Sequence, residues 1–128
     1  MTNSTDTLGT ILLVDDLPDN LQLLSDLLTQ LGYSICCATS GKMALKTLKV
    51  QQPDLILLDI MMPDMDGYQT CAAIKADEML CDIPIIFISA IDDVFDKVQA
   101  FACGGVDYIS KPFRVEEVVA RVESQVTI

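Results

Sequence analysis

Residues 55–67 read LILLDIMMPDMDG, a stretch that joins an apolar run to a turn. Aliphatic residues follow one another without a polar break as far as Asp59, and Pro63 and Gly67 interrupt the pattern soon afterwards. A short continuous apolar run bounded by turn residues is typical of a parallel strand covered on both faces. Such strands belong to sheets with helices on either side, so this stretch predicts an α/β protein.

The same alternation of apolar runs and helical patterns recurs along the whole chain. The apolar runs are Ile11–Val14, Ser34–Ala38, Leu55–Asp59, Ile85–Ser89 and the briefer Tyr108–Ile109. Apolar residues at helical spacing lie between them, and these are Leu21, Leu24, Leu28 and Leu31 in the first such segment, Val94, Val98 and Phe101 in the fourth, and Val115, Val118, Val119, Val122 and Val126 in the last. We therefore predict a (βα)5 protein with a doubly wound, five-stranded parallel sheet. Periodicity alone leaves the order of the strands open.

Length and charge limit the classes of function. The chain has 128 residues, enough for one domain, and 19 acidic against 8 basic residues give it a net charge of -11. This charge repels nucleic acid, so we expect no direct binding to it. Residues 1–9 are polar and are predicted to be a disordered tail ahead of a domain at 10–128. We find no signal peptide and no apolar run near the roughly 20 residues of a membrane span, and we expect a cytoplasmic location.

The cysteines do not form a pattern of their own. They are Cys36, Cys37, Cys71, Cys81 and Cys103. Their number is odd, they include no CxxC pair, and the chain has no histidine to complete a zinc site. We interpret them as small buried hydrophobic residues in a reducing compartment.

Polar residues end the predicted strands. Asp15 and Asp16 follow the first strand, Asp59 ends the third, Ser89 ends the fourth, and Lys111 follows the fifth. Ligands of open parallel sheets bind outside the carboxyl ends of the strands, so these side chains should converge. One such aspartate alone would be an ordinary helix cap or loop residue. Their occurrence at corresponding ends of successive strands predicts a functional site.

The residue types at this site point to phosphoryl transfer. Neighbouring carboxylates repel one another and require a cation. Oxygen ligands without histidine or clustered cysteine favour a hard ion, Mg2+ or Mn2+. Lys111 suits a phosphoryl oxygen or the central carboxylate, and Ser89 can donate a hydrogen bond to another phosphoryl oxygen. With Asp59 as a carboxylate nucleophile, these groups form a device for transferring a phosphoryl group to aspartate.

The sequence from about Thr10 to Val126 resembles the receiver domain of bacterial two-component response regulators. The resemblance rests on Asp15–Asp16, on Asp59 within LLDIMMPDMDG, on Ser89–Ala90 and on Lys111–Pro112–Phe113, at the spacing of the family. Each piece alone is weak, but the joint pattern is specific. It implies the flavodoxin-like strand order 2-1-3-4-5.

The resemblance also implies how phosphate is received. Asp59 would accept phosphate from the phosphohistidine of a histidine kinase or a histidine phosphotransfer domain. Asp15 and Asp16 would hold Mg2+, with Asp16 the more direct ligand. Asp59 and the backbone carbonyl of Met61 would complete the protein ligands. The domain would assist its own phosphorylation and dephosphorylation without acting as an enzyme on a separate substrate.

A conformational switch is implied as well. Ser89 and Lys111 would bind the phosphoryl group, and Tyr108 matches the switch aromatic of the family. A new phosphate pulls a hydroxyl and an ammonium group toward it, and the tyrosine ring would then repack. The surface of the fourth helix, fifth strand and fifth helix would change as a result.

Two departures from the family concern groups beside the site. Serine stands at position 89 where threonine is more usual, which keeps the hydroxyl but loosens packing against Tyr108. Met61 and Ile91 flank the site, two residues beyond Asp59 and Ser89, and both are apolar. Neither can orient a hydrolytic water, so we predict slow loss of phosphate from Asp59.

Other functions were weighed against this one. A magnesium-dependent aspartate-nucleophile phosphatase wants an acid–base aspartate two residues after its nucleophile, where this chain has Met61. A receiver fold that serves only as a binding module would lack an acid, the lysine or the hydroxyl, and none is missing. Asp64 and Asp66 read most simply as turn residues before Gly67. No glycine-rich nucleotide motif follows a strand.

Sequence patterns alone leave the partners open. The sequence does not name the kinase, the signal or the output. It also leaves open a homodimer through the fourth and fifth helices, and Phe95, Ala100 and Ala102 can face either the core or a partner. A stand-alone regulator and a receiver from a larger protein both fit, and the absence of a clear stop in Ser124–Ile128 favours the larger protein.

Overall fold

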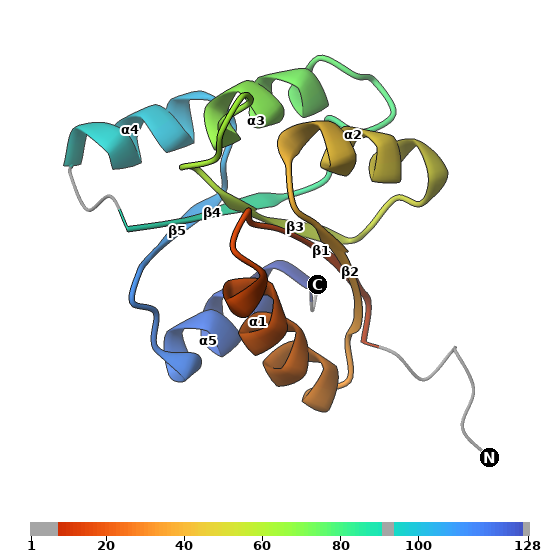
Figure 1. Cartoon of the computed structure of the whole chain (residues 1–128), viewed down its shortest axis with the longest axis vertical. Coiled ribbons are helices and arrows are strands. Elements are labelled where there is room, and N and C mark those ends of the chain that lie inside the picture. The colour runs from red at the N-terminus through yellow and green to blue at the C-terminus, as the bar shows by residue number, and fades with distance from the viewer. Residues whose placement is uncertain (1–7, 91–93, 127–128) are drawn as a thin grey trace.

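The computed structural model describes residues 8–90 and 94–126, in which strands and helices alternate (Figure 1). The strands are β1 (Thr10–Val14), β2 (Ser34–Ala38), β3 (Leu55–Asp59), β4 (Ile85–Ser89) and β5 (Asp107–Ser110). The helices are α1 (Pro18–Gln30), α2 (Gly41–Val50), α3 (Gly67–Lys75), α4 (Val94–Ala102) and α5 (Val115–Val126). The predicted (βα)5 architecture is confirmed.

The strands form a single parallel sheet in the order β2-β1-β3-β4-β5. This is the flavodoxin-like order that the family resemblance implied. β1 lies between β2 and β3, and Val14 pairs with Ala38 on one side and Leu58 on the other. The order reverses between β1 and β3, and in open parallel sheets ligands bind at the carboxyl ends of the strands beside such a reversal.

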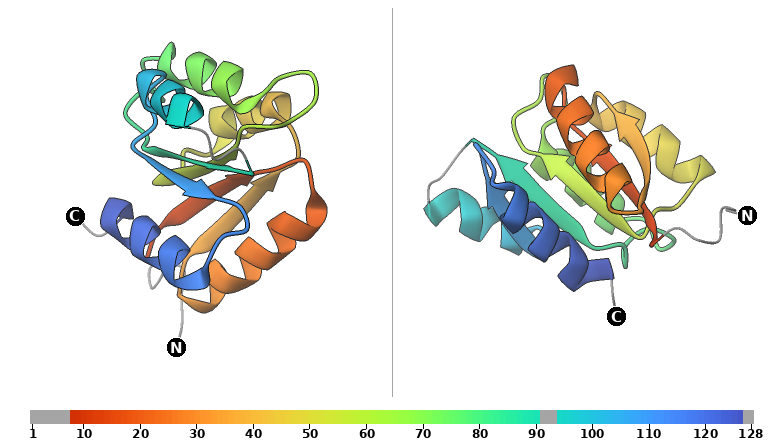
Figure 2. Two further views of the ribbon diagram at one scale, coloured as in Figure 1. Left: turned by 90° about the vertical axis from the view of Figure 1, so that its left-hand side faces the viewer. Right: turned by 90° about the horizontal axis from the view of Figure 1, so that it is seen from below.

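Helices cover both faces of the sheet. Figure 1 shows α2, α3 and α4 on one face and α1 and α5 on the other, and the view from below in Figure 2 shows α1 and α5 lying across the strands. The side chains of β1 therefore point alternately into two hydrophobic cores, one on each face of the sheet. Leu12 and Val14 belong to one core, and Ile11 and Leu13 belong to the other. Each such aliphatic side chain stabilises the fold by about 1.5–3 kcal/mol when fully buried. Burial on both faces explains why the strands are apolar without alternation.

Helix α1 matches its predicted apolar stripe except at its end. Leu21, Leu24 and Leu28 are buried against the sheet. Leu31 instead lies at the carboxyl cap of the helix and is exposed. Ser40 caps α2 as expected, since its side chain accepts a hydrogen bond from the Met43 backbone N–H at 3.1 Å.

Helix α4 forms where it was predicted, but its core-facing side was not identified correctly. Val98 and Phe101 were interpreted as part of an apolar stripe, yet they are 60% and 50% exposed. Ala100 is buried in their place, and Ala102 is exposed. The side chains of Val94 and Phe95 lie outside the described residues. Ala100 is the residue that packs inward, and Val98 and Phe101 remain on the surface.

The amino-terminal boundary involves two backbone contacts. The Leu8 N–H donates to the Gly32 carbonyl at 2.9 Å, and the Ser34 N–H donates to the Gly9 carbonyl at 2.9 Å. The rest of the predicted tail, residues 1–7, lies outside the described residues. None of the helices that the structure describes is long and apolar enough to cross a membrane.

The five cysteines are free thiols. Cys71 is fully buried, in agreement with the interpretation as small hydrophobic residues. Cys37 is exposed on the edge strand β2, so that interpretation does not hold for the whole set.

Candidate functional site

Three aspartates meet at the carboxyl ends of β1 and β3. Asp15 and Asp16 follow β1 directly, and Asp59 is the last residue of β3. One carboxylate oxygen from each lies within 4.8 Å of the others. Asp15 and Asp59 are buried, whereas Asp16 is half-buried. The predicted convergence of these residues is therefore present, at the point where the strand order reverses.

Lys111 supplies a positive charge to this cluster from the end of β5. Its ammonium group lies 2.9 Å from Asp15 Oδ2 and 3.6 Å from Asp59 Oδ1. The sequence suggested a phosphoryl oxygen or the central carboxylate as its partner. The ion pair with Asp59 is present, and the shorter, hydrogen-bonded contact is to Asp15. The Lys111 backbone N–H also donates to the Ser89 carbonyl at 2.8 Å, and the bond from Lys111 to Pro112 is cis. The lysine is thus anchored at both its backbone and its side chain.

The electrostatics of Asp59 reflect its burial and its charged neighbours. Burial, and after it the neighbouring charges of Asp15 and Asp16, raise the pKa of Asp59 from 3.8 to a net value of about 6. Lys111 and a backbone hydrogen bond from Met61 oppose this increase. Within the described residues of the cluster, three carboxylates face the one ammonium group of Lys111, so negative charge is left unbalanced. A hard divalent cation bound by these oxygen atoms would fit the donor set.

Asp15 is held by a residue to which the sequence analysis gave no role. Its Oδ1 accepts a hydrogen bond from the Leu17 backbone N–H at 3.0 Å, and its Oδ2 accepts one from the Asn20 side-chain amide at 3.2 Å. Asn20 lies in the first turn of α1, half-buried. The sequence did contain a signal for this contact: Asn20 is a polar residue in the first turn of a helix that follows two acidic residues.

Ser89 and Tyr108 lie on the neighbouring strands β4 and β5. Ser89 is fully buried and pairs with Ser110 across the sheet. Tyr108 is 5% exposed, so its ring is inside the protein. The ammonium group of Lys97 on α4 lies 5.6 Å from the centre of this ring. The contact between Lys97 and Tyr108 was not predicted from the sequence, because it depends on how α4 lies beside β5.

The loop between β3 and α3 holds the backbone that carries Asp59. Asp66 forms a capping box with Gln69 at the start of α3, in agreement with its interpretation as a turn residue. Asp64 adopts a φ of 68°, a turn conformation that aspartate tolerates. A Cβ atom at Gly67 would collide with the carbonyl oxygen of Asp59, and the Gly67 N–H donates to the Ile60 carbonyl at 2.8 Å. Glycine therefore permits a close approach that fixes the end of β3.

Of the two flanking residues, Met61 and Ile91, the structure describes only Met61. The Met61 side chain is 62% exposed beside the carboxylate cluster. Ile91 lies outside the described residues.

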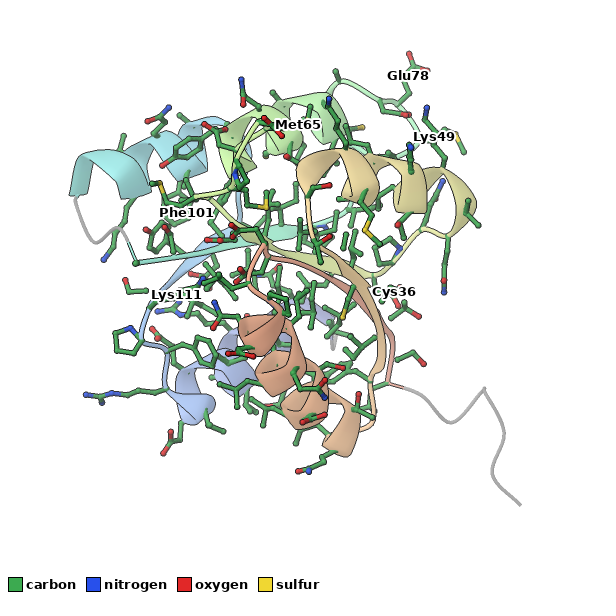
Figure 3. The ribbon with its side chains drawn as sticks, viewed as in Figure 1. Cys36, Lys49, Met65, Glu78, Phe101 and Lys111 are labelled. Atoms are coloured by element: carbon green, nitrogen blue, oxygen red, sulfur yellow. The ribbon has the colours of Figure 1, made fainter. Side chains whose placement is uncertain are left out.

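A separate surface pocket lies away from the carboxylates. It has a volume of about 280 Å3 and is lined by Leu48, Lys49, Gln52, Asp77, Met79 and Leu80. Figure 3 shows Lys49 and Glu78 at the opposite end of the molecule from Lys111. This pocket is therefore not part of the predicted site.

Comparison with known proteins identifies the family that this fold and site define. The model of the response regulator receiver domain family matches residues 11–123. The chain therefore belongs to the receiver domain family of two-component response regulators.

Individual relatives agree with this assignment. The chain is 43% identical, over 115 residues, to the DNA-binding dual master transcriptional regulator RpaA of Synechocystis sp., and the match covers 89% of this chain and 47% of RpaA. A response regulator from Chloroflexus aurantiacus superposes with a TM-score of 0.89 at 32% identity, covering 94% of this chain and 98% of that one. The receiver domain of the sensor histidine kinase PA1611 from Pseudomonas aeruginosa has a TM-score of 0.86 at 31% identity, with the same coverage.

The relatives in the sequence comparison are longer proteins. The chain spans a little less than half the length of the transcriptional regulators that it matches. The match to RpaA thus concerns its receiver domain and not the whole regulator.

Proposed function

We propose that Asp59 is the phosphoacceptor of this receiver domain and takes a phosphoryl group from a phosphohistidine of a histidine kinase or a histidine phosphotransfer domain. The observation that supports this most directly is the position of Asp59: it is buried among Asp15, Asp16 and Lys111, with the Lys111 ammonium group 3.6 Å from its carboxylate. With a pKa of about 6, this carboxylate is mostly ionised at neutral pH and can attack phosphorus as a nucleophile.

Asp15, Asp16, Asp59 and the backbone carbonyl of Met61 would hold Mg2+, or Mn2+ in its place, with Asp16 the more direct ligand. Bound there, the ion would neutralise negative charge on the phosphoryl oxygens. The oxygen-only donor set and the raised pKa of Asp59 support this proposal. The related receiver domain of PA1611 has a magnesium ion coordinated in its active site cleft.

The side chains around Asp59 have separate roles in the transfer. An Asp59 oxygen attacks the phosphorus atom, the bond from phosphorus to the histidine nitrogen breaks, and an acyl phosphate forms on Asp59. Lys111, already within reach of Asp59, contacts one phosphoryl oxygen, and Ser89 donates its hydroxyl hydrogen to another. Catalysis of this kind is mostly positioning and charge stabilisation. The domain modifies itself and has no separate substrate.

Phosphorylation would then change the surface formed by α4, β5 and α5. Ser89 moves toward the phosphate, and Tyr108 repacks into the space near it. The buried ring of Tyr108 and its contact with Lys97 link this movement to α4. An output domain or a second copy of the chain would respond to the altered surface. RpaA is a DNA-binding regulator, whereas the net charge of -11 makes direct DNA contact by this domain unfavourable. We place the domain in the cytoplasm.

The test is phosphorylation with acetyl phosphate and Mg2+, followed by mass spectrometry of the intact protein. We expect the wild type to gain one phosphate and Asp59→Asn to gain none. Asp64→Asn is the matched control, because Asp64 is exposed in the same loop, outside the carboxylate cluster, and asparagine tolerates its backbone conformation. Equal labelling of wild type and Asp59→Asn would exclude Asp59 as the acceptor. No labelling of the wild type by acetyl phosphate or by kinases would favour a binding module.

A further inference from the structure

The Asp15 carboxylate accepts hydrogen bonds from three protein donors. Its Oδ1 accepts from the Leu17 backbone, and its Oδ2 accepts from both Asn20 and Lys111, at 3.2 and 2.9 Å. Both oxygen atoms of this buried carboxylate therefore have protein donors. The donors of Oδ2 come from opposite ends of the chain, because Asn20 is in α1 and Lys111 follows β5.

The hydrogen bond from Asn20 fixes the orientation of the Asp15 carboxylate, which the contacts with Leu17 and Lys111 do not fix. The Leu17 N–H holds only Oδ1, so without a second fixed donor the carboxylate could still tilt about that hydrogen bond. The Lys111 side chain is long and flexible and lies between Asp15 and Asp59. Asn20 is short and belongs to the first turn of α1, so its amide is a fixed point. Its hydrogen bond sets the plane of the Asp15 carboxylate and, through the shared Oδ2, the position of the Lys111 ammonium group.

We propose that Asn20 is a positioning residue of this site, which orients Asp15 for Mg2+ and holds Lys111 between Asp15 and Asp59. The inference rests on the proposed function, since it concerns the same metal site and the same phosphoacceptor. Mg2+ demands near-ideal octahedral geometry, so a carboxylate that is already oriented binds it with less reorganisation. Residues that orient the ligands of a metal ion commonly change its affinity by about tenfold or more.

The same helix offers a matched control. The Gln22 side-chain amide donates to Asp26 at 2.8 Å, so α1 contains a second amide–carboxylate hydrogen bond on its exposed side, away from the site. Replacing either Asn20 or Gln22 removes one side-chain amide and its hydrogen bond from α1. Only loss of the Asn20 bond releases Asp15.

The experiment compares Asn20→Leu, Asn20→Ala and Gln22→Leu with the wild type. Mg2+ affinity is measured by calorimetry without a phosphodonor. The rate of Asp59 phosphorylation by acetyl phosphate is then measured over a range of Mg2+ concentrations. We expect both Asn20 variants to bind Mg2+ about tenfold more weakly and to need about tenfold more Mg2+ for half-maximal rate. Gln22→Leu should match the wild type throughout.

Each result has a definite meaning. Wild-type Mg2+ affinity in a folded Asn20→Leu or Asn20→Ala protein would overturn the proposal. So would an equal loss in Gln22→Leu, because the effect would then belong to the helix and not to Asp15. A structural role alone would lower thermal stability without changing the Mg2+ concentration for half-maximal rate. If the wild type neither binds Mg2+ nor becomes phosphorylated, the proposed function itself fails, and this outcome is distinct from failure of the Asn20 inference.

Discussion

The ammonium group of Lys97 lies 5.6 Å from the centre of the Tyr108 ring. This contact joins α4 to β5 and places a positive charge on the face of a buried aromatic side chain. Such contacts contribute about 0.5–1 kcal/mol at partly exposed positions. The inward position of Tyr108 therefore depends in part on where α4 holds Lys97.

The coupling between these two residues can be measured with a double-mutant cycle. We expect Lys97→Met and Tyr108→Leu to show a coupling of about 0.5–1 kcal/mol in the free energy of unfolding in urea. Methionine keeps the length of the side chain and removes its charge. Additive effects of the two substitutions would show that the contact does not stabilise the protein.

Asp59 should make the stability of the metal-free protein depend on pH. Its pKa is raised from 3.8 to about 6 in the folded state, so folding favours its protonated form. The stability from this preference is fully present below pH 3.8 and is lost as the pH rises through about 6. Compared with the wild type in EDTA, Asp59→Asn should gain up to about 3 kcal/mol between pH 4 and pH 8. A difference between the two proteins that is the same at every pH would contradict this expectation, which urea unfolding tests.

Lys111 should matter most when Mg2+ is absent. Lys111→Met leaves Asp15 and Asp59 without their shared positive charge, and we expect a loss of about 2 kcal/mol in the free energy of unfolding at pH 7.5 in EDTA. Mg2+ should restore part of it by binding the folded state. Lys46→Met, on the exposed face of α2, is the control and should change little. Equal losses with EDTA and with saturating Mg2+ would speak against charge balance as the cause.

Met61 should determine how long the phosphate stays on Asp59. Its exposed apolar side chain offers a hydrolytic water no hydrogen bond, so phosphorylated protein should lose its label slowly. Met61→Asn should hydrolyse about tenfold faster, because an amide can orient the water. Met79→Asn replaces another exposed methionine, far along the chain, and should leave the rate unchanged. Loss of label within seconds from the wild type, or an unchanged rate in Met61→Asn, would refute this prediction.

The strands and the site aspartates could be predicted because their signals are local. Burial of β3 on both faces requires an unbroken apolar run, and Asp59 had to follow where that run ended. The order of the strands came from resemblance, since side-chain periodicity is the same whichever neighbours a strand has. The outward orientation of Val98 and Phe101 could not be read from their spacing, because a helix presents an apolar stripe equally well to a core or to solvent.

Contacts between distant segments were the hardest to foresee. The sequence placed Lys111 at the site, but its nearer approach to Asp15 than to Asp59 depends on the course of the chain after β5. The amide of Asn20 reaches Asp15, five residues earlier, because the first turn of α1 lies beside the carboxyl end of β1. Neither distance follows from residue type. Both depend on loop geometry that sequence patterns do not encode.

The ratio of carboxylates to ammonium groups at this site has a consequence for ion selectivity. Asp15, Asp16 and Asp59 together carry three negative charges when ionised, and Lys111 returns one positive charge. Two negative charges remain, a deficit that a single divalent ion cancels and a single monovalent ion does not. Abundant K+ or Na+ would leave the cluster electrically unbalanced, so an ion at the proposed site would be selected by its valence as well as by its radius.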